Sequence, residues 1–157
     1  MHWSRRIGKD NREYFMPKIR TMQLGAPNVA THLLKTPKKY LTSMGPFLRR
    51  TSLDEIPQVW SILKGDMSFV GPRPLLVEYL KKYSNYEKKR HLVKPGITGL
   101  AQVNPEPSGL KSWNKSIRFD IYYVKNISFF LDIKILYKTM ILVLFKRKQF
   151  EDFRKFK

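Results

Sequence analysis

The chain has 157 residues, no cysteine, and 31 lysines and arginines against 12 aspartates and glutamates, which gives a net charge of +19. This length suits one domain with one core, and the lack of cysteine excludes a disulfide framework, a thiolate nucleophile and a cysteine-bound zinc. So large a positive charge indicates an anionic partner, which is a nucleic acid, an anionic membrane or a phosphorylated ligand.

The first 22 residues predict two short extended segments around a polar turn, GKDN, at residues 8–11. They are rich in charge and have no apolar run, so they are not a signal peptide. Residues 23–45 are predicted to be mostly loop. Residues 47–50 form a short basic approach to an adjacent pair of carboxylates, Asp54 and Glu55.

The clearest predicted helix follows this acidic pair. Its signal is one apolar stripe at helical spacing, made of Ile56, Val59, Trp60 and Leu63. Gly65 is suited to the residue just after the helix.

The start of that helix allows two interpretations. Ser52 and Glu55 have the spacing of a capping box. With Ser52 as the N-cap, however, Pro57 would lie too far inside the helix, where its ring and missing N–H are costly. We therefore expect the cap at Leu53 or Asp54.

The second half of the chain is predicted to be mainly helical. A helix with a basic polar face is expected over 75–91, then a Pro-Gly turn at 94–99 and a short strand at 100–103. Helices are predicted at 114–123 and about 128–147. The apolar run at 129–145 contains Asp132, Lys134 and Lys138, so it is too short and too charged to span a membrane comfortably.

The fold class predicted from these elements is α+β: a single, mostly helical domain with a few short strands and amphipathic helices. We expect residues 1–147 to form this domain and residues 148–157 to form a basic, aromatic tail.

Asp54 and Glu55 suggest phosphate chemistry if they lie in the first turn of a helix. Unpaired backbone N–H groups there attract anions. A carboxylate in that place could ligate Mg²⁺ together with substrate phosphates, or attack phosphorus directly.

Arginines before and after the acidic pair extend this interpretation. Arg49, Arg50 and Arg73 could each hold phosphate oxygens with two parallel hydrogen bonds. Pro72 and Pro74 stiffen the backbone on both sides of Arg73.

Each of these features also has a purely structural explanation. An acidic residue at a helix start is often only a cap, GPRP is often only a rigid loop, and basic runs usually form a solvated face.

The whole stretch from 49 to 76, RRTSLDEIPQVWSILKGDMSFVGPRPLL, resembles the signature of the bacterial sugar transferase family, the monotopic polyprenyl-phosphate phosphoglycosyl transferases. The resemblance continues in RIGKDN, PKIRTM, HLVKPGITGLAQVN and DIYYVKNISFFLDIKILYKT. It covers roughly residues 4 to 145, in the family's order.

The resemblance implies transfer of a phospho-sugar from a UDP-sugar to undecaprenyl (polyprenyl) phosphate, with release of UMP and initiation of a bacterial surface glycan. It implies that Asp54 is the nucleophile of a covalent intermediate and a Mg²⁺ ligand, with Glu55 as its catalytic partner. Arg73 is implied to lie by the phosphates, and Lys18 and Arg20 of PKIRTM are expected to bind phosphate too. The implied location is the cytoplasmic face of the inner membrane.

Two departures from the family pattern stand out. Relatives carry a hydrophobic segment before the RIG block, and this chain begins at MHWSRRIG, so we expect the anchor to be absent. The loop after QVN reads PEPSGLKSW, where many relatives have glycine and asparagine.

Two other functions remain as alternatives. The chain could be an inactive, anchor-less remnant that acts as a basic protein of the anionic membrane surface. A nucleic-acid-binding protein is the second alternative, suggested by the basic and aromatic tail. The sequence has no recognisable nucleic-acid motif and this function leaves the acidic pair unexplained, so we expect no nucleic-acid partner.

Overall fold

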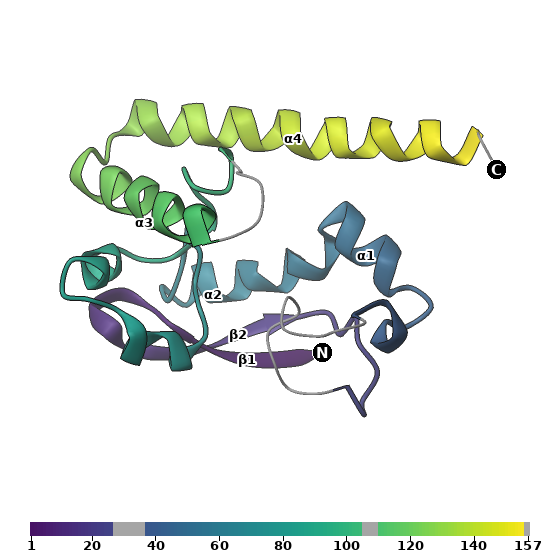
Figure 1. The fold of residues 1–157 in the computed structure, drawn as a ribbon, viewed down its shortest axis with the longest axis horizontal. Helices are drawn as coiled ribbons and strands as arrows, with labels where there is room; N and C mark the ends of the chain where they lie inside the picture. Colours follow the sequence, from purple (N-terminus) through teal and green to yellow (C-terminus); the bar gives the residue numbers. More distant parts are fainter. Residues whose placement is uncertain (27–36, 105–109, 156–157) are drawn as a thin grey trace.

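The computed structural model describes residues 1–26, 37–104 and 110–155, without side-chain detail at 37–38, 110–112 and 145–155. Two small two-stranded sheets are combined with helices, which confirms the predicted α+β class. In Figure 1 the hairpin lies at one side, the short helices α1 and α2 lie in the middle, and the long helix α4 runs along the opposite side. The elements are β1 His2–Ile7, η1 Lys9–Asn11, β2 Glu13–Lys18, η3 Pro37–Tyr40, α1 Gly45–Thr51, η4 Leu53–Gln58, α2 Val59–Leu63, β3 Ser68–Val70, η5 Val77–Lys82, η6 Glu87–Leu92, β4 Gly96–Thr98, α3 Leu110–Lys125 and α4 Phe129–Lys155, where η is a 3₁₀-helix.

Strands β1 and β2 form the predicted hairpin. They are antiparallel, with His2 opposite Lys18 and Ile7 opposite Glu13. The turn between them is tight because Asp10 and Asn11 both adopt positive φ, which these two residue types tolerate best after glycine. Side chains alternate along a strand, so neighbouring residues of the hairpin point to opposite faces.

The helix predicted after the acidic pair is divided. Its first part, η4, is a 3₁₀-helix that contains Pro57, and α2 is α-helical only from Val59. The proline has no N–H and its ring disturbs α-helical bonding, which accounts for the tighter first part. Ser52 has left-handed backbone angles and makes no side-chain cap, so the capping box suggested by the sequence does not form.

The apolar stripe of this segment faces outward. Ile56 and Trp60 are each 56% exposed and Leu63 is 75% exposed, whereas Gln58 and Ser61 are buried. The polar side of the segment therefore packs against the protein, and its apolar side is left at the surface.

The single helix predicted over 75–91 is wrong. Two 3₁₀-helices, η5 and η6, occupy this region, and the chain turns between them. The hydroxyl and backbone N–H of Ser84 both donate to the Glu87 carboxylate, and the Glu87 N–H donates back to the Ser84 hydroxyl. These reciprocal bonds have the pattern of a capping box. They close the turn that leads into η6 and separate it from η5.

The predicted strand lies four residues earlier than expected. Residues 100–103 form a turn, and the strand is β4, which pairs in parallel with β3. Just past β3, the Gly71 N–H donates to the Thr98 carbonyl at 2.9 Å. A Cβ on Gly96 would come within 2.2 Å of the Gly71 nitrogen, so the two backbones cross where only glycine fits.

Helices α3 and α4 close the core from the other side (Figure 1). The cluster that α4 covers is made of Val70, Val103, Tyr123 and Ile135. Helix α3 begins at Leu110, four residues before the predicted start, and α4 continues to Lys155, past the predicted end at 147. No described helix is long and apolar enough to cross a membrane. Residues 27–36, within the predicted loop at 23–45, and residues 105–109 of the PEPSGLKSW loop lie outside the described residues.

Candidate active site

The carboxylate of Glu55 is held by two cations from different parts of the chain. Lys18, at the end of β2, is 2.8 Å from Glu55 Oε1, and Arg73, in the loop after β3, is 3.2 Å from the same oxygen. Burial acts to raise the pKa of Glu55, but Arg73 and Lys18 outweigh it and leave the pKa below its usual value. Glu55 is therefore an ionised group that joins the hairpin to the GPRP loop.

Lys18 is also strongly affected by burial. Burial lowers its pKa, and the nearby Glu55 carboxylate opposes this effect. The ammonium group is thus a partly desolvated cation, and such a cation interacts more strongly with an added anion than an exposed lysine does.

Asp54 stands beside this ion-pair cluster but does not join it. The Asp54 carbonyl accepts a hydrogen bond from the Ile19 N–H at 3.0 Å, which fixes η4 against the end of β2. Its half-buried carboxylate forms no ion pair with any described residue. Burial raises the pKa of Asp54, while Lys18 counteracts the rise. Of the two carboxylates, Asp54 is the one that no ion pair holds among the described residues.

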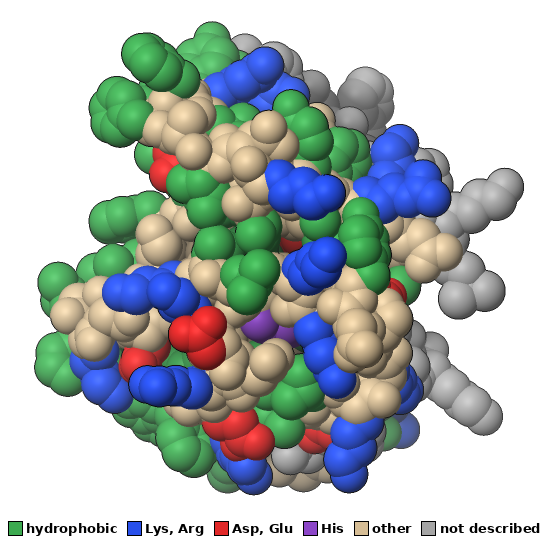
Figure 2. Space-filling view, turned by 90° about the vertical axis from the view of Figure 1, so that its left-hand side faces the viewer, with side chains coloured by type: hydrophobic (Ala, Val, Ile, Leu, Met, Phe, Trp, Pro, Cys, Tyr) green, Lys and Arg blue, Asp and Glu red, His purple; other side chains and the backbone are tan. Residues whose placement is uncertain are grey.

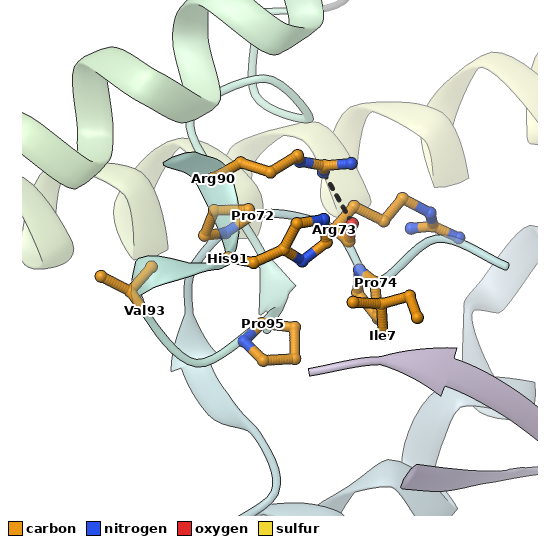
Figure 3. A pocket seen from close by; sticks show the side chains of 8 residues that line it. All are labelled: Ile7, Pro72, Arg73, Pro74, Arg90, His91, Val93 and Pro95. Atoms are coloured by element: carbon orange, nitrogen blue, oxygen red, sulfur yellow. Dashed lines mark hydrogen bonds between the residues drawn. The ribbon is translucent and has the colours of Figure 1, made fainter. Parts of the chain in front are cut away.

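A buried hydrogen-bond network, centred on Arg90, holds the backbone of Arg73 in place. Figure 3 shows Arg90 reaching across to the Arg73 carbonyl, at 2.8 Å, while the Arg73 side chain extends away from it. Arg90 also pairs with Asp120 at 2.6 Å and donates to the Tyr83 hydroxyl. Pro72 and Pro74 are buried on either side of the exposed Arg73.

His91 fills the space beside this network and is shown in Figure 3 between the loop and the neighbouring backbone. It is buried, and burial together with the Arg90 charge lowers its pKa to about 4. Burial also raises the pKa of Asp120 to about 6, against the effect of Arg90. Sequence reasoning assigned no role at the site to Arg90, His91 or Asp120, although His91 and Asp120 begin two of the segments that carry the family resemblance.

Not all of the predicted phosphate-binding arginines join the site. Arg49 donates to the Thr21 hydroxyl at 2.9 Å and influences Asp54 only electrostatically. Arg50 and Arg20 are exposed. Among the described residues Arg20 makes no hydrogen bond or ion pair with the acidic pair, whereas Lys18 and Arg73 both contact Glu55.

A small recess beside Glu55 contains two residues that sequence reasoning missed. Arg6 from β1 and Gln58 from η4 line it together with Lys18 and Arg73. The alternation of β1 turns Arg6 inward and Arg5 outward, and this was the one available signal. Sequence alone does not reveal which side of the strand faces the acidic pair.

The donor set partly fits a magnesium ion. In the part of the chain that the structure describes, no group of three or more acidic or histidine side chains is arranged so that it could hold a metal ion. Mg²⁺, however, often takes only one or two carboxylates and completes its shell with water and substrate phosphates. Asp54 fits the role of such a single ligand, and the arrangement as a whole can bind phosphate and present a carboxylate to it.

Comparison with known proteins gives a consistent result. The profile described as "Bacterial sugar transferase" matches residues 1–146. The uncharacterized sugar transferase EpsL of Bacillus subtilis is 52% identical over 64% of this chain, which corresponds to 48% of that protein. The UDP-glucose:undecaprenyl-phosphate glucose-1-phosphate transferase of Xanthomonas campestris is 42% identical over 89% of this chain and 30% of its own length. The undecaprenyl-phosphate galactose phosphotransferase of Salmonella typhimurium is 36% identical over 88% of this chain and 32% of its own length.

The chain thus spans about half of the first relative's length and about a third of that of the other two.

Proposed function

The chain belongs to the bacterial sugar transferase family, and we propose that it transfers a phospho-sugar from a UDP-sugar to undecaprenyl phosphate and releases UMP. The names of the relatives from Xanthomonas and Salmonella support this reaction. Those names specify glucose in one protein and galactose in the other, so the family admits more than one sugar and the donor is left open.

The proposed mechanism is covalent. One carboxylate oxygen of Asp54 attacks the phosphorus that carries the sugar. A bond forms between this oxygen and phosphorus, and the bond from phosphorus to the UMP oxygen breaks, so that UMP leaves with the electron pair. A phosphate oxygen of the polyprenyl phosphate then attacks the same phosphorus and releases the Asp54 carboxylate.

The observation that carries this assignment is the contrast between the two adjacent carboxylates. Glu55 is fixed between Lys18 and Arg73, whereas Asp54 makes no ion pair with any described residue. A nucleophile must be free to leave its resting contacts, and a residue that binds two cations is poorly suited to do so. Arg73 and Lys18 are positioned to stabilise phosphate charge, which is the larger part of catalysis in phosphoryl transfer.

Magnesium is the proposed cofactor, with Asp54 as its protein ligand. When bound, Mg²⁺ would neutralise charge on the phosphate oxygens. The residues of the chain have the separate task of orientation: Glu55 holds Lys18 and Arg73 in fixed places, and Arg90 supports the backbone from which Arg73 extends.

We also propose that the domain lies on the cytoplasmic face of the inner membrane. Helix α4 exposes a line of large apolar side chains at helical spacing, among them Phe130, Ile133, Tyr137, Met140 and Leu144. In Figure 2 hydrophobic side chains protrude at the top of the face shown, near the start of α4, and lysines and arginines are spread below them. Exposed apolar groups beside basic ones favour a surface of anionic lipid.

The test of the mechanism omits the lipid acceptor. The protein is incubated with Mg²⁺ and UDP-glucose or UDP-galactose, and its intact mass is measured. We expect a protein adduct with the added mass of a phospho-sugar, located on Asp54 by peptide mapping, together with released UMP. Asp54→Asn keeps the size of the side chain but should form no adduct, and its turnover with acceptor should fall by orders of magnitude.

Asp10→Asn is the matched control, since it makes the same chemical change at an exposed turn residue. Its backbone has positive φ, which asparagine tolerates well. This variant should form the adduct like the wild type. Turnover with acceptor that survives Asp54→Asn would show that Asp54 is not the nucleophile.

A further inference from the structure

The recess beside Glu55 holds more positive charge than its protein partners neutralise. The side chains of Arg6, Lys18 and Arg73 line it with one carboxylate, that of Glu55, which leaves an excess of two positive charges. Glu55 already bonds Lys18 and Arg73. Arg6 is the cation for which no carboxylate is left within the recess.

Arg6 is poorly satisfied in other respects too. Its only described side-chain hydrogen bond is a long one, at 3.5 Å, from Nη1 to the Pro74 carbonyl, and its buried Nε has no partner in the described structure. Burial lowers its pKa, and the charge of Arg73 lowers it further. A partly buried cation that is repelled by its neighbour is stabilised when an anion binds between the two.

Gln58 supplies a second and independent sign of a missing ligand. It is only 3% exposed, it lines the same recess, and its amide Nε2 has no described hydrogen-bond partner. A buried N–H donor without an acceptor costs about 1–3 kcal/mol, so folded proteins rarely keep one without a reason. A bound oxyanion would satisfy this donor and the Arg6 Nε together.

The size of the recess restricts the ligand. Its cavity volume is about 20 Å³, little more than the roughly 10–15 Å³ that one water molecule needs. The recess therefore excludes a base or a sugar ring and admits at most one small group, such as a single phosphate at its open mouth, with the remainder of a larger ligand outside.

We propose that Arg6 and Gln58, with Lys18 and Arg73, form a binding pocket for a single phosphate group, in which Arg6 and Gln58 supply the inner donors. The assignment of that phosphate to the nucleotide donor or to the polyprenyl acceptor rests on the proposed function. The binding of phosphate in the pocket does not rest on it. The three probes are therefore inorganic phosphate, UMP and farnesyl phosphate, which serves as a short, soluble polyprenyl phosphate.

The experiment measures binding of each probe to the 157-residue chain by calorimetry at constant ionic strength. Arg6→Gln should lower the affinity for inorganic phosphate by at least about tenfold, since hydrogen bonds to charged groups are worth about 1.5–3 kcal/mol. Arg5→Gln is the control, because it makes the same charge change on the next residue of β1, which is exposed and paired with Glu13. It should change binding by less than about twofold, as expected for a surface ion pair.

If Arg6→Gln also lowers the affinity for UMP, the pocket binds a phosphate of the nucleotide donor. If it lowers the affinity for farnesyl phosphate instead, the pocket binds the phosphate of the polyprenyl acceptor. Equal losses in Arg5→Gln and Arg6→Gln would mean that phosphate binds only through net charge, and this would overturn the proposal. So would wild-type protein that binds no inorganic phosphate. None of these measurements requires turnover, so they remain decisive even if Asp54 is not the nucleophile.

Gln58→Leu gives a second test that does not depend on a charge change. Phosphate should raise the melting temperature of the wild type, because a ligand that binds only the folded state stabilises it. In Gln58→Leu this phosphate-dependent rise should be largely lost. A merely structural role for Gln58 predicts the opposite result, in which the melting temperature changes in phosphate-free buffer but the rise on adding phosphate is kept.

Discussion

At the scale of single residues, two adjacent carboxylates differ in their surroundings, and the roles that we propose for them differ accordingly. Glu55 is ionised between two cations, which depress its pKa against the effect of burial. Asp54, one residue earlier, has its pKa raised by burial and forms no ion pair among the described residues. The sequence predicted both residues at the site, but it could not distinguish them, because the partners of Glu55 come from positions 37 residues before and 18 residues after it.

His91 gives a residue-scale prediction about pH. Burial, then the charge of Arg90, lowers its pKa from 6.5 to about 4. As the pH falls from about 6.5 to 4, the unfolded chain binds the proton first, so the folded state loses stability in this window. His91→Gln keeps a neutral polar side chain and removes this proton uptake. The free energy of unfolding of the wild type should therefore fall by about 3 kcal/mol more than that of the variant over this range.

The measurement is urea unfolding of both proteins at several pH values between 7 and 4. Asp120 titrates near the same range with the opposite sign, since its pKa is raised to about 6, but it is present in both proteins and its contribution cancels to first order in the comparison. Identical pH profiles for the two proteins would show that His91 is not held neutral by its burial.

At the scale of elements, the sequence predicted best where the signal was local. The hairpin was predicted because the turn residues 8–11 and the flanking strands all contribute to one small unit. The pattern Ser-x-x-Glu occurs twice, at Ser52 and Ser84, and the structure forms a capping box only at the second. The difference is tertiary: at Ser52 the chain leaves α1 with a left-handed residue, and the following segment is fixed by the hydrogen bond from Ile19 to the Asp54 carbonyl.

The segment at 53–63 shows a second limit of the pattern. An apolar stripe at helical spacing usually marks the buried face of a helix. Here the buried positions are polar and the stripe is exposed. Periodicity shows that the two faces of a helix differ. It does not show which face packs against the protein and which is left exposed.

The crossing of β3 and β4 carries the element-scale prediction. Gly96→Ala places a methyl group within 2.2 Å of the Gly71 backbone nitrogen, and the neighbouring backbone cannot move without breaking the hydrogen bond from Gly71 to Thr98. We expect a loss of about 1–3 kcal/mol or more in the free energy of unfolding. Activity should fall too, because the Gly71 backbone leads directly into the loop that carries Arg73.

Gly25→Ala serves as the control for this substitution, since a Cβ there would meet no atom within 4 Å. Its free energy of unfolding should be unchanged or slightly higher. The comparison is made by denaturant unfolding, and the idea fails if the two variants unfold at the same denaturant concentration.

At the scale of the whole molecule, the same small domain combines a net charge of +19 with two exposed apolar surfaces. One is the apolar stripe at residues 56–63, and the other is the outer side of α4. Helix α4 covers the core with one side, through Ile135, and exposes apolar residues on another. A helix that is apolar on two sides is normally buried on both. On a membrane surface the outer side of α4 would be covered by lipid, and the basic residues would meet anionic headgroups. One explanation would then account for both the high positive charge and the exposed apolar residues.

This explanation is tested by sedimentation with liposomes of anionic and of neutral lipid. The wild type should sediment with anionic liposomes at low salt, and less strongly with neutral ones, because each basic residue near an anionic surface contributes about 1 kcal/mol. The double variant Phe130→Asp, Tyr137→Asp places charge on the outer side of α4, where both residues are exposed, so it should fold normally and bind liposomes weakly. Phe15→Asp makes a comparable change at an exposed site on the hairpin, and we expect it to bind like the wild type. If the wild type sediments with neither kind of liposome, lipid does not cover α4; if the α4 double variant and Phe15→Asp are weakened equally, the binding surface is not specific to that helix.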